Sequence, residues 1–347
     1  MSTQQAGHPR VSVLIAAYNS IETLGETIDS VLAQTYPNVE IVVVDDGSTD
    51  ATPELLRGYG DRIKVVTKAN GGVPTSRNAG LRAASGDYIA LLDADDLCRP
   101  GRIAAQMAVM RTLGDVALCA TEFTAFSADG ELSPAFSSTY YSTLAEEGAM
   151  ARLLNRRDEI ESEGIRHVVH SGIAYPKLLF GNFLHPPTTL FPRSTWERNG
   201  DFDATFHSHA DWPWIARAAR FGPVAFIATP LLDYRLSARQ LSGPANRARR
   251  THETIALARK VMTLDPEAVS AHRESADAFL AETFLDGADA LSDTEKRAAW
   301  NYLREGMAHT SALSPAVLKI ALKIALPPAV LRASRRLRGS DVSKGWR

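Results

Sequence analysis

Residues 88–96 read Tyr88-Ile-Ala-Leu-Leu-Asp-Ala-Asp-Asp96, a mostly apolar run that ends in three carboxylates. Its apolar first part is typical of a strand that is buried on both faces of a parallel sheet. Asp93, Asp95 and Asp96 follow at the carboxyl end of that strand, the edge at which open α/β sheets bind ligands. Three carboxylates this close repel one another unless positive charge lies between them. A divalent cation is the simplest such charge, and oxygen ligands favour Mg²⁺ or Mn²⁺.

The composition is that of an ordinary globular protein of 347 residues, with 45% hydrophobic and 22% charged residues and a formal net charge of −2. This charge gives no overall field that would attract nucleic acid. Two cysteines, Cys98 and Cys119, form neither a disulfide framework nor a zinc motif. Residues 1–9 are polar and predict a disordered lead-in, not a signal peptide. No apolar run is long enough to predict a membrane-spanning helix, so we expect a cytoplasmic protein.

Short strands alternate with helices through the first part of the chain, which predicts βαβ units and a mainly parallel sheet flanked by helices. Strands are expected at 11–17, 39–44, 63–67, 88–93, 116–121, 224–228 and 231–235. From 127 to about 175 the pattern weakens, and we expect helices and loops over the sheet edge there. After about residue 243 the composition becomes rich in alanine, arginine and glutamate, and helices are expected near 246–263, 266–286, 292–309 and 315–326.

A second acidic strand end, Asp45-Asp46, follows the apolar strand at 39–44. Because parallel strands end at the same edge, we expect these carboxylates to lie near Asp93 and Asp95. A dinucleotide-binding site would need a glycine-rich turn after the first strand. That turn reads Ala16-Ala-Tyr-Asn-Ser20 and contains no glycine, and the lysine motif of a P-loop is also absent. Any phosphates are therefore expected to be held by a metal and side chains.

Four segments in this order resemble the successive motifs of the family 2 glycosyltransferases, which have the GT-A fold. They are Val11–Asn19, Val44–Asp50, Gly72–Gly80 and Gly86–Asp96, and the resemblance extends from about 10 to 240. It implies an inverting transferase that uses a nucleotide-diphosphate sugar, most simply a UDP-sugar. The expected domains are a GT-A domain at 10–243, with a nucleotide-sugar half at 10–125 and an acceptor and catalytic half at 126–243, and a helical region at 244–347.

The resemblance also implies which residues bind the donor. Ala17 and Tyr18 correspond to residues that lie along the nucleobase. The pair Asp45-Asp46 corresponds to the acidic group that contacts uracil or ribose, and which of the two does so stays open. Arg77, in a Ser-Arg-Asn segment, corresponds to an arginine that reaches toward the nucleotide.

The remaining implied roles concern the diphosphate and the acceptor. Asp93, Ala94 and Asp95 form an Asp-x-Asp (DXD) motif, which in the family binds the diphosphate through Mg²⁺ or Mn²⁺, with Asp95 as the more direct ligand. Asp211, at the start of an expected helix, corresponds to the general base. A carboxylate in this role takes the proton of the attacking hydroxyl, while a metal stabilises the charge of the leaving diphosphate.

Some positions depart from the family pattern. Relatives often have Glu-Asp where this chain has Ala210-Asp211, and many have a histidine soon after the Tyr-Arg pair at 234–235. The imidazole of His209 is one substitute for the missing glutamate, and Arg235 or Arg239 is an alternative diphosphate contact. Trp212 and Trp214 are interpreted first as packing residues and second as a platform for the acceptor. His185 is interpreted as structural or acceptor-side and not as a metal ligand.

Two other functions remain as alternatives: a sugar-phosphate nucleotidyltransferase, and a GT-A protein that binds nucleotide-sugars without transferring them. The expected acceptor is a glycan or a lipid-linked molecule in bacterial polysaccharide synthesis. Lys319 and Lys323 lie one turn apart in an otherwise apolar helix, and the tail beyond it has several arginines. Either this helix packs on the domain with its lysines in water, or it contacts the inner face of the membrane.

Overall fold

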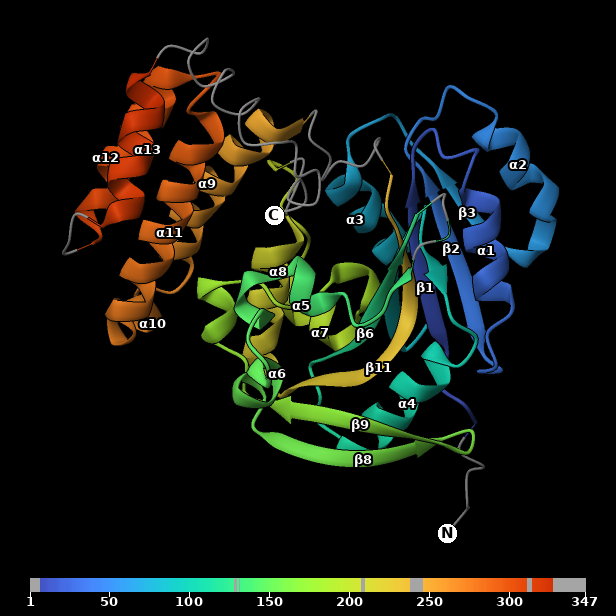
Figure 1. Ribbon diagram of the computed structural model, residues 1–347. Coiled ribbons are helices and arrows are strands. Elements are labelled where there is room, and N and C mark those ends of the chain that lie inside the picture. The colour runs from blue at the N-terminus through green and yellow to red at the C-terminus, as the bar shows by residue number, and fades with distance from the viewer. Residues whose placement is uncertain are drawn as a thin grey trace. The chain divides into compact units, whose positions relative to one another are not determined.

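The computed structural model describes residues 7–127, 130, 132–206, 210–237, 246–310 and 314–326 (Figure 1). It divides into two compact units. The first contains residues up to Leu178 together with Asn182–Ser237, and the second contains Leu179–Gly181 together with the chain from Ala238 onward.

The first unit is built on one large mixed sheet. Its described strands are β1 (Val11–Ala17), β2 (Val39–Asp45), β3 (Lys64–Thr67), β4 (Tyr88–Asp93), β5 (Leu97–Cys98), β6 (Leu118–Phe126), β7 (Leu132–Ser133), β8 (Arg156–Ser162), β9 (Ile165–Gly172), β10 (Leu190–Pro192) and β11 (Val224–Arg235). They run in the order β3-β2-β1-β4-β10-β6-β11-β9-β8, with β5 beside β11 and β7 beside β6. The predicted α/β architecture is confirmed. The pairs β3-β2, β2-β1, β1-β4 and β6-β11 are parallel, and antiparallel pairs join the rest.

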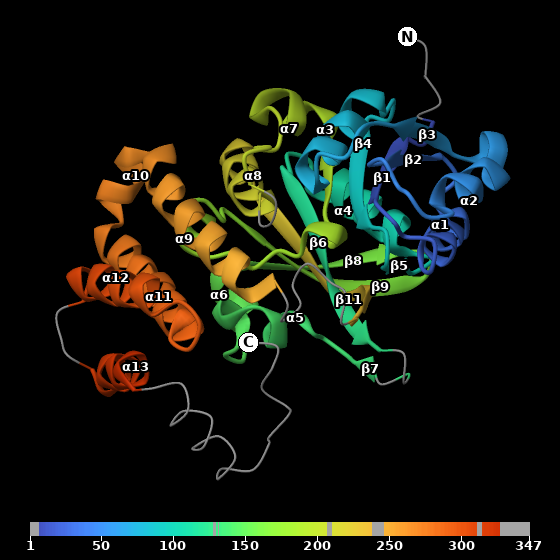
Figure 2. The ribbon, with the colours of Figure 1, turned by 90° about the horizontal axis from the view of Figure 1, so that it is seen from above.

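Helices cover both faces of the sheet (Figures 1 and 2). They are α1 (Leu24–Leu32), α2 (Thr52–Tyr59), α3 (Val73–Ala83), α4 (Arg102–Leu113), α5 (Ser137–Tyr140), α6 (Ala149–Leu153), α7 (Arg193–Asn199) and α8 (Asp211–Ala218). Side chains of β1 alternate between the two faces, as strand geometry requires. Val13 and Ile15 belong to the same buried cluster as Leu24 and Ile28 of α1. Leu14 faces the other way, toward α3.

Close packing on the α3 side explains a glycine in that helix. A Cβ atom placed on Gly80 would lie 2.6 Å from the Leu14 side chain. Gly86, just before β4, is similarly confined, because a Cβ there would lie 2.7 Å from the backbone nitrogen of Ser12, which cannot rotate away as a side chain can. These close approaches hold α3 and the start of β4 against β1. They thereby fix the depth at which the end of β4 presents its carboxylates.

The prediction for the segment after 127 was wrong where it expected helices and loops at 155–163. The chain there forms an antiparallel hairpin of β8 and β9. Its turn, Glu163-Gly164, has φ of 54° and 78°, as a two-residue hairpin turn of type I′ requires. Ile160 is the one buried residue of β8, and the other positions are largely charged. An edge strand with one solvated face carries little hydrophobic pattern, which is why this strand is hard to predict from its residues.

The second unit is helical, as the composition predicted. Its helices are α9 (Arg247–Leu264), α10 (Pro266–Ala271), α11 (Arg273–Leu291), α12 (Lys296–Ala308) and α13 (Pro315–Ala325). The single helix expected at 266–286 is two helices, because the backbone of His272 leaves the helical region with φ −120° and ψ 42°. None of the helices within the described residues is long and apolar enough to cross a membrane.

Candidate functional site

The carboxyl ends of β1, β2 and β4 meet at one edge of the sheet. In the register of the parallel pairs, Ala17 lies opposite Asp45 and Ala16 lies opposite Asp93. The two acidic strand ends are therefore separated by one strand, or about 10 Å at the usual strand spacing. Tyr18, the first residue beyond β1, is 49% exposed at this edge, whereas Ala17 is buried.

Hydrogen bonds join the loop after β1 to the loop after β2. The backbone N–H of Asn19 donates to Ser48 Oγ at 2.9 Å, and Asn19 Oδ1 accepts from the backbone N–H of Thr49 at 2.8 Å. Asn19 has φ of 49°, a left-handed conformation that asparagine tolerates well. This turn ends β1 abruptly and leaves Tyr18 projecting beyond the sheet.

The two carboxylates of the Asp45-Asp46 pair have different surroundings. Asp45 Oδ1 accepts from the backbone N–H of Ser48 at 2.9 Å. Asp46 binds the loop after β3: it pairs with Lys68 and accepts from the backbone N–H groups of Gly71 and Gly72 at 3.0 and 2.7 Å. Asp46 therefore holds the entrance of α3 against the end of β2. The contact that either residue makes with a nucleobase stays a prediction.

The Asp-Ala-Asp turn after β4 is held from two directions. The hydroxyls of Thr23 and Thr27 both donate to the carbonyl oxygen of Ala94, at 2.9 and 3.0 Å. From β11, Arg235 Nε donates to the carbonyl oxygen of Asp95 at 2.8 Å, and the same guanidinium pairs with Glu26 at 2.5 Å. Arg235 thus holds the turn through the Asp95 carbonyl. A contact between Arg235 and the diphosphate stays a prediction.

The side chains of the turn alternate in exposure. Those of Asp93 and Asp95 are partly exposed, whereas Asp96 is fully buried. Asp96 Oδ1 accepts from the backbone N–H of Arg235 at 3.1 Å, and Asp96 Oδ2 has no hydrogen-bond partner within the described ranges. Burial, together with the charges of Asp95 and Asp93, raises the pKa of Asp96 well above its usual value. Asp93 and Asp95 are therefore the carboxylates of this turn that a ligand can reach.

Arg77 of α3 connects the turn to the start of α8. Its Nη2 donates to Asp93 Oδ1 at 3.0 Å, and its Nη1 lies 3.4 Å from Asp211 Oδ2. Asp211 Oδ1 also accepts from the backbone N–H of Trp212 at 2.8 Å. The Arg77 side chain is 7% exposed, so its charge acts on both carboxylates in a poorly solvated place. Burial raises the pKa of Asp93, the Arg77 charge opposes that rise, and the Asp211 charge adds to it.

A neutral aromatic group lies near these charges, and of its members the sequence singled out only His185. Its centre is His185, which is stacked on Phe123 with ring centroids 4.4 Å apart and lies 3.4 Å from the Tyr141 hydroxyl through Nδ1. Burial, together with the charges of Arg77 and Arg102, lowers the pKa of His185 to about 3. Burial also raises the pKa of Tyr141, with Tyr140 and Asp211 contributing. Because its residues come from three separate segments, no local motif indicates that they form a group.

The buried imidazole gives a pH prediction. An unfolded chain protonates His185 below about pH 6.5, whereas the folded protein leaves it neutral down to about pH 3. This group's stabilising effect is therefore complete above pH 6.5 and is lost as the pH falls from 6.5 toward 3. Between pH 7.5 and 5.0 the loss is about 2 kcal/mol. Urea unfolding at both pH values should show that the free energy of unfolding of His185→Gln lacks this decrease.

His8→Gln, in the exposed segment before β1, is the matched control and should follow the wild type. An equal loss of stability on acidification in the His185→Gln variant and the wild type would contradict the prediction.

The two tryptophans of α8 and the candidates His209 and Arg239 remain to be placed. Trp212 and Trp214 are 7% and 1% exposed, and their indole N–H groups donate to the carbonyl oxygens of Leu178 and Gly200. They are packing residues, as the first interpretation held, and their burial leaves no face for an acceptor. His209 and Arg239 lie outside the described residues.

A divalent metal fits the donor set at this edge. Asp93 and Asp95 supply hard oxygen atoms on a partly exposed turn, which suits Mg²⁺ or Mn²⁺. In the part of the chain that the structure describes, no three His, Cys, Asp or Glu side chains are grouped to enclose a metal. An ion at the turn would therefore complete its coordination with phosphate oxygens and water, the usual arrangement for Mg²⁺ bound with a nucleotide.

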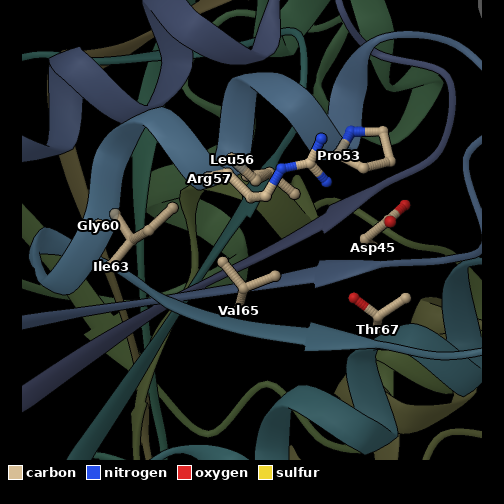
Figure 3. A pocket seen from close by; sticks show the side chains of 8 residues that line it. All are labelled: Asp45, Pro53, Leu56, Arg57, Gly60, Ile63, Val65 and Thr67. Atoms are coloured by element: carbon tan, nitrogen blue, oxygen red, sulfur yellow. The ribbon is translucent and has the colours of Figure 1, made fainter.

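A separate pocket of about 310 Å³ lies between α2 and the edge of the sheet (Figure 3). Its lining is mixed: Leu56 and Arg57 come from α2, Ile63 and Val65 lie across from them, and Asp45 lies at one end. It contains none of Arg77, Asp93 and Asp211. The pocket is also at the lower limit of volume for a small-ligand site, so it does not replace the edge of the sheet as the candidate site.

Comparison with known sequences finds similar proteins over the N-terminal part of the chain. Residues 12–165 match the model of glycosyl transferase family 2. An uncharacterized glycosyltransferase of Rickettsia typhi is 42% identical over 110 residues, which is 32% of this chain and 35% of that protein. The succinoglycan biosynthesis protein ExoO of Rhizobium meliloti is 47% identical over 97 residues, 27% of this chain and 28% of ExoO. The match thus spans about a third of the length of these curated relatives.

Comparison with solved structures gives the fold. The structure of residues 1–349 of S. aureus TarS has a TM-score of 0.61 at 17% identity and covers 96% of this chain and 93% of its own. A mannosyltransferase from Pyrobaculum calidifontis, solved with GDP-Man and Mn²⁺, has a TM-score of 0.56 at 19% identity, covering 98% of this chain and 84% of its own. The chain thus has a fold similar to that of these proteins, and its residues 12–165 match glycosyl transferase family 2.

Proposed function

We propose that this protein is an inverting, metal-dependent glycosyltransferase that moves a sugar from a nucleotide-diphosphate donor to a hydroxyl acceptor. The observation that supports this most strongly is the arrangement in which Arg77 pairs with both Asp93 and Asp211. It brings a carboxylate from the start of α8 next to the turn after β4, although the two are more than a hundred residues apart in sequence. A transferase needs such an arrangement, because one acid must serve the leaving group and another must serve the nucleophile.

The donor is proposed to lie along the ends of β1, β2 and β4. The exposed ring of Tyr18, next to Ala17, offers a flat surface for a nucleobase, and Asp45 or Asp46 supplies an acceptor for a base or ribose donor group. The diphosphate then reaches Asp93 and Asp95. The metal at that turn supplies positive charge that stabilises the leaving diphosphate. A UDP-sugar is the proposed donor, and the S. aureus TarS fold neighbour has been solved with UDP-GlcNAc.

The chemical step is proposed to use Asp211 as the general base. The acceptor hydroxyl oxygen attacks the anomeric carbon from the face opposite the diphosphate, and its proton passes to a carboxylate oxygen of Asp211. The bond between the anomeric carbon and the phosphate oxygen breaks, and its electron pair leaves with the nucleoside diphosphate. A single displacement inverts the anomeric centre and needs no covalent intermediate. The backbone N–H of Trp212 fixes one oxygen of Asp211, which orients the other.

Successive parts of the chain have different proposed roles. We propose that residues 10–125 bind the nucleotide-sugar and that 126–243 supply the base and the acceptor side, while 244–347 form the helical region with its basic tail. The neutral group of Tyr141 and His185 is the proposed wall of the acceptor side, because Tyr141 lies within the electrostatic reach of Asp211. A neutral wall contacts sugar hydroxyls without competing for the metal. Polysaccharide synthesis is the proposed setting, in line with the named role of ExoO.

The products distinguish this function from the alternatives. Purified protein is incubated with UDP-, GDP- and dTDP-sugars, with Mg²⁺, with Mn²⁺ or with a chelator, and slow donor hydrolysis is followed by nucleotide chromatography. We expect a nucleoside diphosphate to accumulate from one donor class only when metal is present. Pyrophosphate released from sugar phosphate and a nucleoside triphosphate would instead indicate a nucleotidyltransferase. Donor binding without turnover, in the presence of candidate acceptors, would indicate a non-catalytic protein.

A further inference from the structure

The last described helix, α13, has one buried side and one apolar exposed side. Val317, Ile320 and Ile324 are at most 8% exposed and belong to the core of the second unit. Leu318 and Leu322 point away from that core and are 59% and 60% exposed. Single exposed leucines are ordinary on protein surfaces, but these two are separated by one helical turn and lie on the same stripe. The outer side of α13 is therefore an apolar strip.

An aromatic residue of α12 lies at the same level as this strip. Lys296 of α12 donates to the carbonyl oxygen of Leu326, just beyond the end of α13, so the two helices run antiparallel. Trp300 follows Lys296 by one turn on the same side of α12, and it is 46% exposed. Counting one turn back from Leu326 along α13 gives Leu322. Trp300 thus exposes a large amphipathic ring on the helix next to α13, and such rings favour membrane–water interfaces.

Basic residues lie within α13 and after it in the sequence, whereas α11, which packs against α13, carries acids such as Asp286 and Asp289. Lys319 is exposed on the outer side of α13, between the two leucines in sequence. Lys323, the second lysine of the helix, is paired with Asp289, so its charge is already neutralised within the protein. Beyond the described residues, the sequence 327–347 has six basic residues, Arg332, Arg335, Arg336, Arg338, Lys344 and Arg347, against the single acid Asp341. The chain as a whole is slightly acidic, so this positive charge is concentrated next to α13.

We propose that the outer side of α13, defined by Leu318, Leu322 and Trp300, docks onto an anionic phospholipid bilayer. The eleven-residue helix is too short to span a bilayer and would lie flat in the interface. Apolar side chains enter the headgroup boundary, while the basic tail is attracted to the lipid phosphates. A second copy of the chain fits less well, because two such surfaces would bring like charges together. The proposal is independent of the transfer activity, since it concerns lipid binding alone.

The test measures binding of the full chain to vesicles. Vesicles of phosphatidylglycerol and phosphatidylcholine in equal amounts are compared with pure phosphatidylcholine by co-sedimentation, without any nucleotide-sugar. We expect binding to the mixed vesicles that weakens as salt is raised, and much weaker binding to phosphatidylcholine. The double variant Leu318→Glu/Leu322→Glu should lower the partition coefficient at least about tenfold, because it removes the apolar insertion. Replacing Arg335, Arg336 and Arg338 by Gln should remove the preference for anionic lipid.

The matched control is Ile165→Glu/Ile173→Glu, which places two charges at similarly exposed apolar positions of the first unit. It should bind like the wild type, and circular dichroism melting should show that both double variants remain folded. The proposal is overturned if the wild type does not bind anionic vesicles at low salt, or if the α13 variant binds as well as the control. It is also overturned if light scattering shows a dimer that only the α13 variant dissociates while lipid binding is absent.

Discussion

Asp211→Asn is expected to lower kcat for sugar transfer by about 10³-fold, within the range that general bases contribute, while the dissociation constant of the donor changes little. Asparagine keeps the shape of the side chain and can still accept from the backbone N–H of Trp212, so the start of α8 should stay in place. What is lost is the ability to take a proton from the attacking hydroxyl. Donor binding is measured by calorimetry and transfer by product formation.

Asp201→Asn is the appropriate control, because Asp201 precedes the same helix and forms an exposed ion pair with Arg82. Exposed pairs of this kind contribute little to stability, so that variant should bind donor and turn over like the wild type. Weakened donor binding with normal turnover in Asp211→Asn would contradict the base role. It would instead indicate that Asp211 serves mainly to hold Arg77.

Asp95→Asn is expected to abolish the metal stimulation of donor hydrolysis and transfer, with a loss of about 10³-fold in kcat/KM. Asp95 is one of the two carboxylates of the turn that a ligand can reach, whereas Asp96 is buried. Replacing one charged oxygen ligand by an amide weakens Mg²⁺ or Mn²⁺ at the diphosphate. The readouts are the activity as metal is titrated, and the metal dependence of donor binding.

Asp61→Asn, at an exposed position of the first unit, controls for the general loss of one negative charge. The Asp95 variant should need a much higher metal concentration or show no response to metal at all, while the control responds as the wild type does. An unchanged metal response in Asp95→Asn would show that the ion, or the diphosphate, is held elsewhere. The Asp211 and Asp95 variants thus separate the two halves of the proposed mechanism, since only the Asp95 change should alter metal-dependent donor binding.

The supporting contacts of the site explain why sequence reasoning found its acidic residues but not their partners. Asp93 and Asp95 follow a conspicuous apolar strand, so their place at the sheet edge could be read locally. The residues that hold the turn, Thr23, Thr27 and Arg235, come from α1 and β11 and have no motif of their own. The sequence pattern suggested a diphosphate contact for Arg235, and the structure adds a bond from its guanidinium to the carbonyl oxygen of Asp95.

The contrast between residues with a local pattern and residues that depend on distant partners also explains why the hairpin of β8 and β9 was not predicted. A buried strand carries its pattern in its own residues, because both faces must be apolar. An edge strand such as β8 buries little more than Ile160, and its register depends on β9 and on the Glu163-Gly164 turn. Charged residues at 155–163 are compatible with several local structures, and only pairing with β9 selects the strand.

The sequence by itself determined the α/β architecture and the acidic strand ends at 45–46 and 93–95. These follow from short-range patterns: apolar runs, their lengths and the residues at their ends. Only the tertiary structure decided that Arg77 lies between Asp93 and Asp211, that Asp96 is buried, and that His185 is held neutral. Each of these depends on which distant segments pack together, and burial and electrostatic pairing arise from that packing and not from neighbours in the chain.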